Sequence, residues 1–145
     1  MSKELILLIA EDDTANFILT KRLLKRWNVN LPLIRFTDGR TLLDFLYTAT
    51  IVNKPTEVEY LLFLDINMPY IDGFEVLSQM KSSPQLEHIP IFMLTTTEDP
   101  LAIKRCFNLG CDAFFTKPLK YDELTSTLKK LRIHLLPQPE PTQKS

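Results

Sequence analysis

Four short polar clusters interrupt an otherwise apolar pattern, and their side chains are the kinds that phosphoryl chemistry uses. They are Glu11-Asp12-Asp13, Asp65, Thr95-Thr96-Thr97 and Lys117-Pro118. Asp65 closes the most apolar run of the chain, residues 60–64. Open parallel sheets bind ligands outside the carboxyl ends of their strands, which is where such a residue would lie. Each cluster alone also fits a turn or a helix cap. The chemistry therefore depends on whether the fold brings the four together.

Carboxylates gathered at one edge of a sheet repel each other unless they share a cation or a proton. An all-oxygen set of Asp12, Asp65, a backbone carbonyl near Asn67 and water suits Mg²⁺. Lys117 and Thr95 would add a charge and a hydroxyl to stabilise three negative oxygens around an attacking carboxylate. The residues therefore fit the formation of an aspartyl phosphate.

The elements that would position these residues alternate between strands and helices. Four of the five expected strands are nearly unbroken apolar runs, as parallel strands covered on both faces are. The expected strands are 5–10, 33–36, 60–64, 91–94 and 113–115. Helical patterns follow each strand, so the economical fold is α/β, a doubly wound five-stranded parallel sheet of the (βα)5 type.

Two of the helical patterns are clear apolar stripes, and both are expected to face the core. Their residues are Ala15, Ile18, Leu19, Leu23 and Trp27 in one, and Leu124, Leu128, Leu131 and Leu135 in the other. Helices near 39–47, 73–81 and 100–108 complete the set. The stretch 48–59 is longer than a usual connection, and we interpret it as an insertion or an extended helix end.

Length and composition limit the classes of function. The 145 residues predict one domain over 1–136, followed by a proline-rich tail over 137–145 that we expect to be extended and flexible. With 17 basic and 18 acidic residues the net charge is −1, which argues against binding nucleic acid through bulk charge. No apolar run reaches the length of a membrane span, so we expect a cytoplasmic protein without a membrane partner. Cys106 and Cys111 lack the spacing of a zinc site.

Together the motifs resemble the receiver domain of bacterial two-component response regulators. The resemblance rests on Glu11-Asp12-Asp13, on Asp65 with Asn67 and Pro69 after it, on Asp72-Gly73, on Leu94-Thr95 and on Lys117-Pro118, and it covers residues 4–135. It implies a flavodoxin-like fold with strand order 2-1-3-4-5. The segment 83–90 and the long stretch before residue 60 are similar to those of stand-alone receivers, including some associated with bacterial phytochromes.

The resemblance also implies a set of metal ligands. Asp65 would be the phosphoacceptor, and Mg²⁺ would be the cofactor. Asp12 would hold the metal directly and Glu11 through water, while the backbone of Asn67 would add a ligand.

Further residues would bind the phosphoryl group or respond to it. Thr95 would be the switch hydroxyl and Lys117 the phosphoryl partner. Phe114 matches the switch aromatic of the family, although a plain core role carries equal weight. The family usually has a small residue after the switch hydroxyl, so Thr96 would narrow access to the phosphoryl group.

We therefore expect a switch and not a metabolic enzyme, with a sensor histidine kinase as donor and no output domain of its own. A downstream protein target and a homodimer stay open, and the apolar segment 103–107 is either a partner face or ordinary surface. Two rival functions also remain. One is an aspartate-nucleophile phosphohydrolase, although such enzymes usually have an acid where Asn67 stands. The other is a scaffold that is never phosphorylated.

Overall fold

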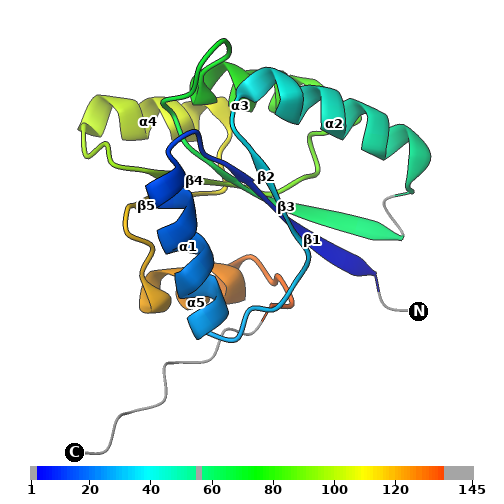
Figure 1. Cartoon of the computed structure of the whole chain (residues 1–145). Helices are drawn as coiled ribbons and strands as arrows, with labels where there is room; N and C mark the ends of the chain where they lie inside the picture. The colour runs from blue at the N-terminus through cyan, green and yellow to red at the C-terminus, as the bar shows by residue number, and fades with distance from the viewer. Residues whose placement is uncertain (1–2, 55–56, 136–145) are drawn as a thin grey trace, which may run out of the picture.

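Five parallel strands form one sheet in the order β2-β1-β3-β4-β5, and helices cover both of its faces (Figure 1). The computed structural model describes residues 3–54 and 57–135. The strands are β1 Glu4–Ala10, β2 Leu33–Phe36, β3 Val58–Leu64, β4 Ile91–Thr95 and β5 Ala113–Thr116. The helices are α1 Thr14–Arg26, α2 Gly39–Val52, α3 Gly73–Ser82, α4 Pro100–Leu109 and α5 Tyr121–Lys130. The predicted fold class and strand order are confirmed.

Each face of the sheet has its own apolar core, which explains the unbroken apolar strands. Leu8, Leu62 and Met93 point toward α2, α3 and α4, and Leu7 and Phe63 point toward α1 and α5. Figure 1 shows these two helical layers on opposite sides of the strands. Because successive side chains of a strand point to opposite faces, a strand covered twice must be apolar throughout.

The register aligns the carboxyl ends of the strands. Ala10 pairs with Leu64, and Thr95 pairs with Thr116. The ladder continues beyond the strands, because the Asp65 amide donates to the Ala10 carbonyl at 3.1 Å. The polar clusters thus begin at one edge of the sheet, as predicted.

Each of the two apolar stripes was predicted correctly only in part, and in the first stripe Leu23 and Trp27 pack into the core as expected. In α1, Ile18 and Leu19 are 42% and 46% exposed, and Ala15 is exposed too, because Thr20 and Leu24 set the buried face of this helix instead. These apolar residues lie on the face of the helix that points away from the sheet.

The second stripe is not continuous helix. Helix α5 ends at Lys130, Leu131 is its partly exposed C-cap, and Arg132 has a left-handed φ of 58° that turns the chain. Leu135 still reaches the core, but it does so from the segment after this turn. Leu124 and Leu128 are buried as expected.

The stretch 48–59 begins as an extended helix end, which was one of its two interpretations. Helix α2 runs to Val52, and Ile51 and Val52 are exposed on its last turn. Gln85 holds this turn by donating to the Tyr47 carbonyl at 3.0 Å and to the Thr50 hydroxyl. Residues 55–56 of the stretch, and the tail predicted for 137–145, lie outside the described residues.

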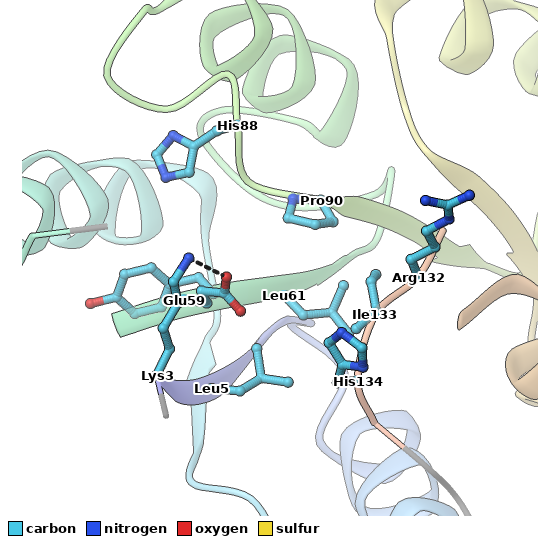
Figure 2. A pocket seen from close by; sticks show the side chains of 10 residues that line it. Lys3, Leu5, Glu59, Leu61, His88, Pro90, Arg132, Ile133 and His134 are labelled. Atoms are coloured by element: carbon cyan, nitrogen blue, oxygen red, sulfur yellow. Dashed lines mark hydrogen bonds and ion pairs between the residues drawn. The ribbon is translucent and has the colours of Figure 1, made fainter. Parts of the chain in front are cut away.

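The opposite edge of the sheet carries a cavity of about 790 Å³. Lys3, Leu5, Glu59 and His134 are among its lining residues (Figure 2). The Lys3 ammonium forms an ion pair with Glu59 at 3.0 Å on this rim. In the described residues, no helix is both long and apolar enough to cross a membrane.

Candidate functional site

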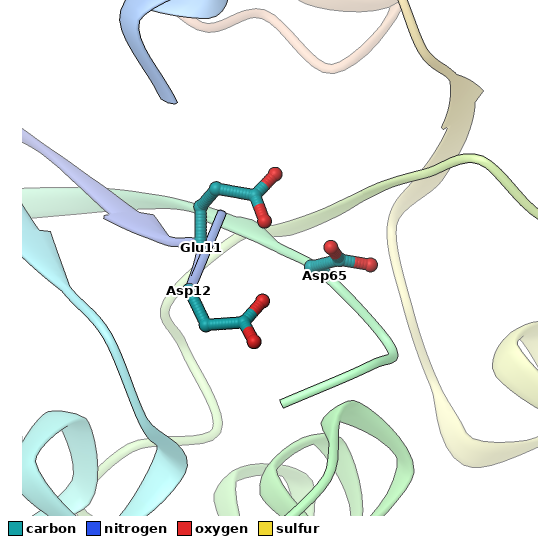
Figure 3. A group of neighbouring side chains, drawn as sticks. All are labelled: Glu11, Asp12 and Asp65. Carbon is teal, nitrogen blue, oxygen red and sulfur yellow. The ribbon is translucent and has the colours of Figure 1, made fainter. Parts of the chain in front are cut away.

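Three carboxylates meet at the carboxyl edge of the sheet. Glu11 and Asp12 directly follow β1, Asp65 directly follows β3, and each offers an oxygen atom within 4.8 Å of the others. Figure 3 shows the three side chains gathered around a common space. Glu11 and Asp65 are buried, whereas Asp12 is exposed. We call these residues the acidic cluster.

Lys117, which follows β5, reaches across β4 into the acidic cluster. Its ammonium donates to Asp65 Oδ2 at 2.8 Å and also to Glu11 Oε1. The backbone fixes its position, because the Lys117 amide donates to the Thr95 carbonyl at 2.8 Å. A cation at this place offsets part of the repulsion among the buried carboxylates.

The titration of the two buried partners reflects this environment. Burial raises the pKa of Glu11 above its ordinary value, since desolvation outweighs the hydrogen bond from Lys117. For Lys117, burial by itself lowers the pKa, but hydrogen bonds to Asp65 and Glu11 and the two negative charges leave it raised. Lys117 therefore stays protonated at neutral pH.

Helix capping shapes the first loop, which is residues 11–13 between β1 and α1. Asp13 is the N-cap of α1, with a side-chain oxygen accepting from the Asn16 amide at 3.0 Å. The Asp13 amide in turn donates to Glu11 Oε2 at 3.2 Å. Both interpretations of the acidic motif are thus partly right, because its third residue caps the helix and the first two join the acidic cluster.

The loop after Asp65 is held against the start of α3. The Asn67 amide donates to Asp65 Oδ1 at 3.3 Å, and the Gly73 amide donates to the Ile66 carbonyl at 2.8 Å. A Cβ atom at Gly73 would lie 2.3 Å from the Asp65 carbonyl oxygen. Only glycine allows this close approach of the helix to the Asp65 backbone.

The Thr95 hydroxyl is an orphan. The residue is fully buried at the end of β4, and within the described ranges its Oγ1 is the buried side-chain polar atom without a hydrogen-bond partner. Native structures contain few such groups, and each calls for an explanation such as a missing ligand. The neighbouring Thr96 is exposed.

Phe114 lies on β5 between the core and the surface. It is half-buried, pairs with Met93 across the sheet and packs against the core on the α2, α3 and α4 side. It also lines a surface hollow together with Glu98 and Lys117. Its core role and its switch role are both compatible with this place.

Sequence reasoning missed Arg35, whose guanidinium contacts the first loop. It lies in β2 beside Ile9 of β1, and it donates to the backbone of the acidic motif. The available signal was a lone arginine inside the short apolar run 33–36. A charged residue in such a strand calls for a partner at the strand end.

Comparisons with known proteins found a matching family model, similar sequences and similar folds. The family model described as response regulator receiver domain matches residues 7–129. Response regulator Rcp1 of Synechocystis sp. is 31% identical over 120 residues, covering 82% of this chain and 80% of that protein. The structure of the bacteriophytochrome response regulator AtBRR superposes with a TM-score of 0.76 at 30% identity, covering 92% and 95% of the two chains. The Mn²⁺-bound form of Rcp1 gives a TM-score of 0.68 at 27% identity over 94% and 99%.

Proposed function

This chain belongs to the response regulator receiver domain family, and from that premise we propose that Asp65 accepts a phosphoryl group from the phosphohistidine of a sensor histidine kinase. Members of this family are signalling proteins. One observation carries the proposal: the Asp65 carboxylate lies within 4.8 Å of two further carboxylates and accepts from the Lys117 ammonium at 2.8 Å. A downstream target and a homodimer belong to the same proposal, and the cytoplasmic location stays a prediction.

The transfer itself is a simple displacement. An Asp65 carboxylate oxygen attacks the phosphorus, the new P–O bond forms, and the bond between phosphorus and the donor imidazole nitrogen breaks. The nitrogen keeps the electron pair and takes up a proton. Lys117 lies where it can balance the negative phosphoryl oxygens, and the buried Thr95 hydroxyl can donate to one of them.

The acidic cluster fits Mg²⁺ by the chemistry of its donors, which are all oxygen atoms. Asp12 and Asp65 would bind it directly, Glu11 through water, and the Asn67 carbonyl would add a ligand. The bound ion would neutralise charge on the acidic cluster and on the phosphoryl oxygens.

We propose that the same residues form a conformational switch. A phosphoryl group on Asp65 would give the orphan Thr95 hydroxyl an acceptor, and movement of Thr95 would vacate space that Phe114 can fill. Two packings of one core often differ by a few kcal/mol, so a single charge-assisted contact can bias them. Thr95→Ala should then still be phosphorylated but lose the coupling to partner binding. Beryllofluoride, a mimic of the phosphoryl group, should change partner binding or self-association in the wild type more than in Thr95→Ala. An equal change in the two proteins would contradict this role of Thr95.

Intact mass before and after incubation with acetyl phosphate and Mg²⁺ tests the acceptor. The wild type should gain one phosphoryl group, and Asp65→Asn should gain none while keeping its melting temperature. Asp44→Asn, the same change at an exposed position of α2, is the matched control and should behave as wild type. Stable phosphorylation of Asp65→Asn would disprove the assignment.

The same assay separates the rival functions. A phosphohydrolase would turn over small phosphate esters many times per molecule, and an unphosphorylated scaffold would gain no mass.

The metal site has its own test in Asp12→Asn, which removes one charge and one direct ligand. Calorimetry should show weaker Mg²⁺ binding, and unchanged affinity would remove Asp12 from the ligand set.

A further inference from the structure

We propose that Arg35 is a positioning residue that holds the backbone of Glu11 and Asp12 in the shape that binds the divalent cation. This inference rests on the proposed function, because it concerns the same metal site. Arg35 would touch neither the metal nor the phosphoryl group. It would act through the loop that carries two of the three carboxylates.

The contacts of Arg35 converge on that loop. Its Nε donates to the Glu11 carbonyl at 3.1 Å, and its Nη2 donates to the Asp12 carbonyl at 3.3 Å. Nη2 also donates to the Thr14 hydroxyl at 3.2 Å, at the first residue of α1. One planar group thus joins the end of β1 to the start of α1.

The guanidinium is itself held in place. It lies over the Phe17 ring, with its carbon 4.7 Å from the ring centroid, and the side chain is half-buried in β2. The strand places it as well, because Arg35 pairs with Ile9 and the Glu11 amide donates to the Phe36 carbonyl at 2.9 Å. A rigid planar fork loses little side-chain entropy for each hydrogen bond that it forms.

Lys117 and Arg35 both carry a positive charge at this edge of the sheet, but they contact different atoms of the acidic cluster. Lys117 donates to carboxylate oxygens, which are the atoms that a metal would use. Arg35 contacts backbone carbonyls and a hydroxyl, so these hydrogen bonds occupy no carboxylate oxygen of Glu11 or Asp12. Like charges on a loose loop would separate to relieve repulsion, and fastening the carbonyls opposes that movement.

Two explanations of the role of Arg35 predict opposite changes in metal affinity when the residue is replaced. If it acted only as a nearby positive charge, its removal would strengthen the binding of a cation, because like charges repel. If it positions the ligands, its removal should weaken binding. Residues that orient metal ligands typically contribute about 10- to 100-fold in affinity. The sign of the change therefore decides between them.

Calorimetric titration of the full chain with Mg²⁺ provides the test. Arg35→Met should bind about tenfold more weakly than wild type. Arg35→Lys keeps the charge but loses the fork, so it should fall between the two. Arg22→Met, the same substitution at an exposed position of α1, is the matched control and should bind as wild type. Equal or tighter binding by Arg35→Met would overturn the proposal.

Two further readouts separate positioning from a general loss of stability. The Mg²⁺ concentration for half-maximal phosphorylation should rise in Arg35→Met, whereas the rate at saturating Mg²⁺ should stay near that of wild type. In the metal-free protein, amide exchange should quicken at Asp13 and Asn16, whose amides are bonded within this loop. Exchange that quickens equally throughout the core would instead overturn the proposal.

Two other results have clear meanings. If Arg35→Met does not fold, Arg35→Lys decides by the same criterion, and unchanged affinity of that variant would overturn the positioning role. If the wild type binds Mg²⁺ and Arg35→Met binds it equally well, Arg35 is excluded but the proposed function stands. A wild type that takes up no Mg²⁺ would overturn the metal site itself, and this inference with it.

Discussion

The ammonium of Lys117 lies 2.8 Å from Asp65 Oδ2, although 52 residues separate the two in the chain. The same ammonium bonds Glu11, so one cation occupies two of the three carboxylates in the acidic cluster. Both partners are almost fully buried, with 8% of each side chain exposed. Lys117 therefore competes with any metal for these oxygen atoms in the unphosphorylated protein.

Removing this competitor should tighten metal binding. We expect Lys117→Met to bind Mg²⁺ at least tenfold more tightly, because a nearby unit charge contributes a few kcal/mol at the effective dielectric of a protein surface and about 1.4 kcal/mol is tenfold in affinity. Phosphorylation should nevertheless slow, since the phosphoryl oxygens lose a cation. Calorimetry and intact mass measure the two effects. Weaker Mg²⁺ binding would show that Lys117 organises the acidic cluster instead of competing for it.

The orphan hydroxyl of Thr95 should reduce the stability of the unphosphorylated protein. A buried, unsatisfied polar group costs about 1–3 kcal/mol, so Thr95→Val should raise the free energy of unfolding by about 1 kcal/mol. Urea denaturation without metal measures this change. Thr50→Val is a suitable contrast, because the Thr50 hydroxyl donates to the Leu46 carbonyl at 2.7 Å and its loss should not stabilise. A less stable Thr95→Val would indicate a partner for that hydroxyl.

Glu11 should make stability depend on pH. Burial raises its pKa above 4.5, so the folded protein keeps this proton to a higher pH than the unfolded chain does. The stability that the group contributes is complete below the unfolded pKa and is lost as pH rises through the folded pKa. Glu11→Gln cannot titrate. Without metal, its melting temperature relative to wild type should therefore increase as the pH rises above 4.5 and through the folded pKa of Glu11.

Lys117 does not disturb this comparison, because its raised pKa keeps it protonated over the same range. Glu87→Gln, at an exposed position, is the control and should show no such trend. A difference between Glu11→Gln and wild type that is constant with pH would contradict the role of burial.

The exposed and half-buried apolar residues of α4 should respond differently to a charged substitution. Phe107 is 51% exposed and Ile103 is half-buried. Phe107→Glu should leave the free energy of unfolding within about 0.5 kcal/mol of wild type, as surface changes usually do. It should weaken binding to the kinase or self-association, which sedimentation or surface binding measures. Ile103→Glu should be less stable. Normal association of Phe107→Glu would leave Phe107 as ordinary surface.

The sequence predicted the acidic cluster because a parallel sheet has a simple rule. All its strands end at one edge, so residues that follow different strands meet there. The polar residues at or just after the ends of β1, β3, β4 and β5 could thus be placed together without knowledge of any side chain. Strand β2 was predicted at its observed bounds, Leu33–Phe36, since a short apolar run leaves little freedom.

Helix faces were harder to predict. Ile18 and Leu19 resemble core residues by type, but the phase of α1 is set by its packing against the sheet, which leaves them partly exposed. The end of α5 depends on the left-handed Arg132, a conformation that is uncommon for this residue type and gives no signal. The contacts of Arg35 were missed because they join a strand to a loop 23 and 24 residues away.

The first and last described residues of the chain lie near the edge of the sheet that faces away from the acidic cluster. Lys3 and His134 line one cavity there, beside the first residues of β1 and β3 (Figure 2). A fluorescent reporter or an immobilising linker joined through either of these neighbourhoods would therefore sit across the sheet from Asp65. Such a fusion would leave the carboxyl edge of the sheet unobstructed, so the proposed phosphorylation could be followed on a surface-bound protein.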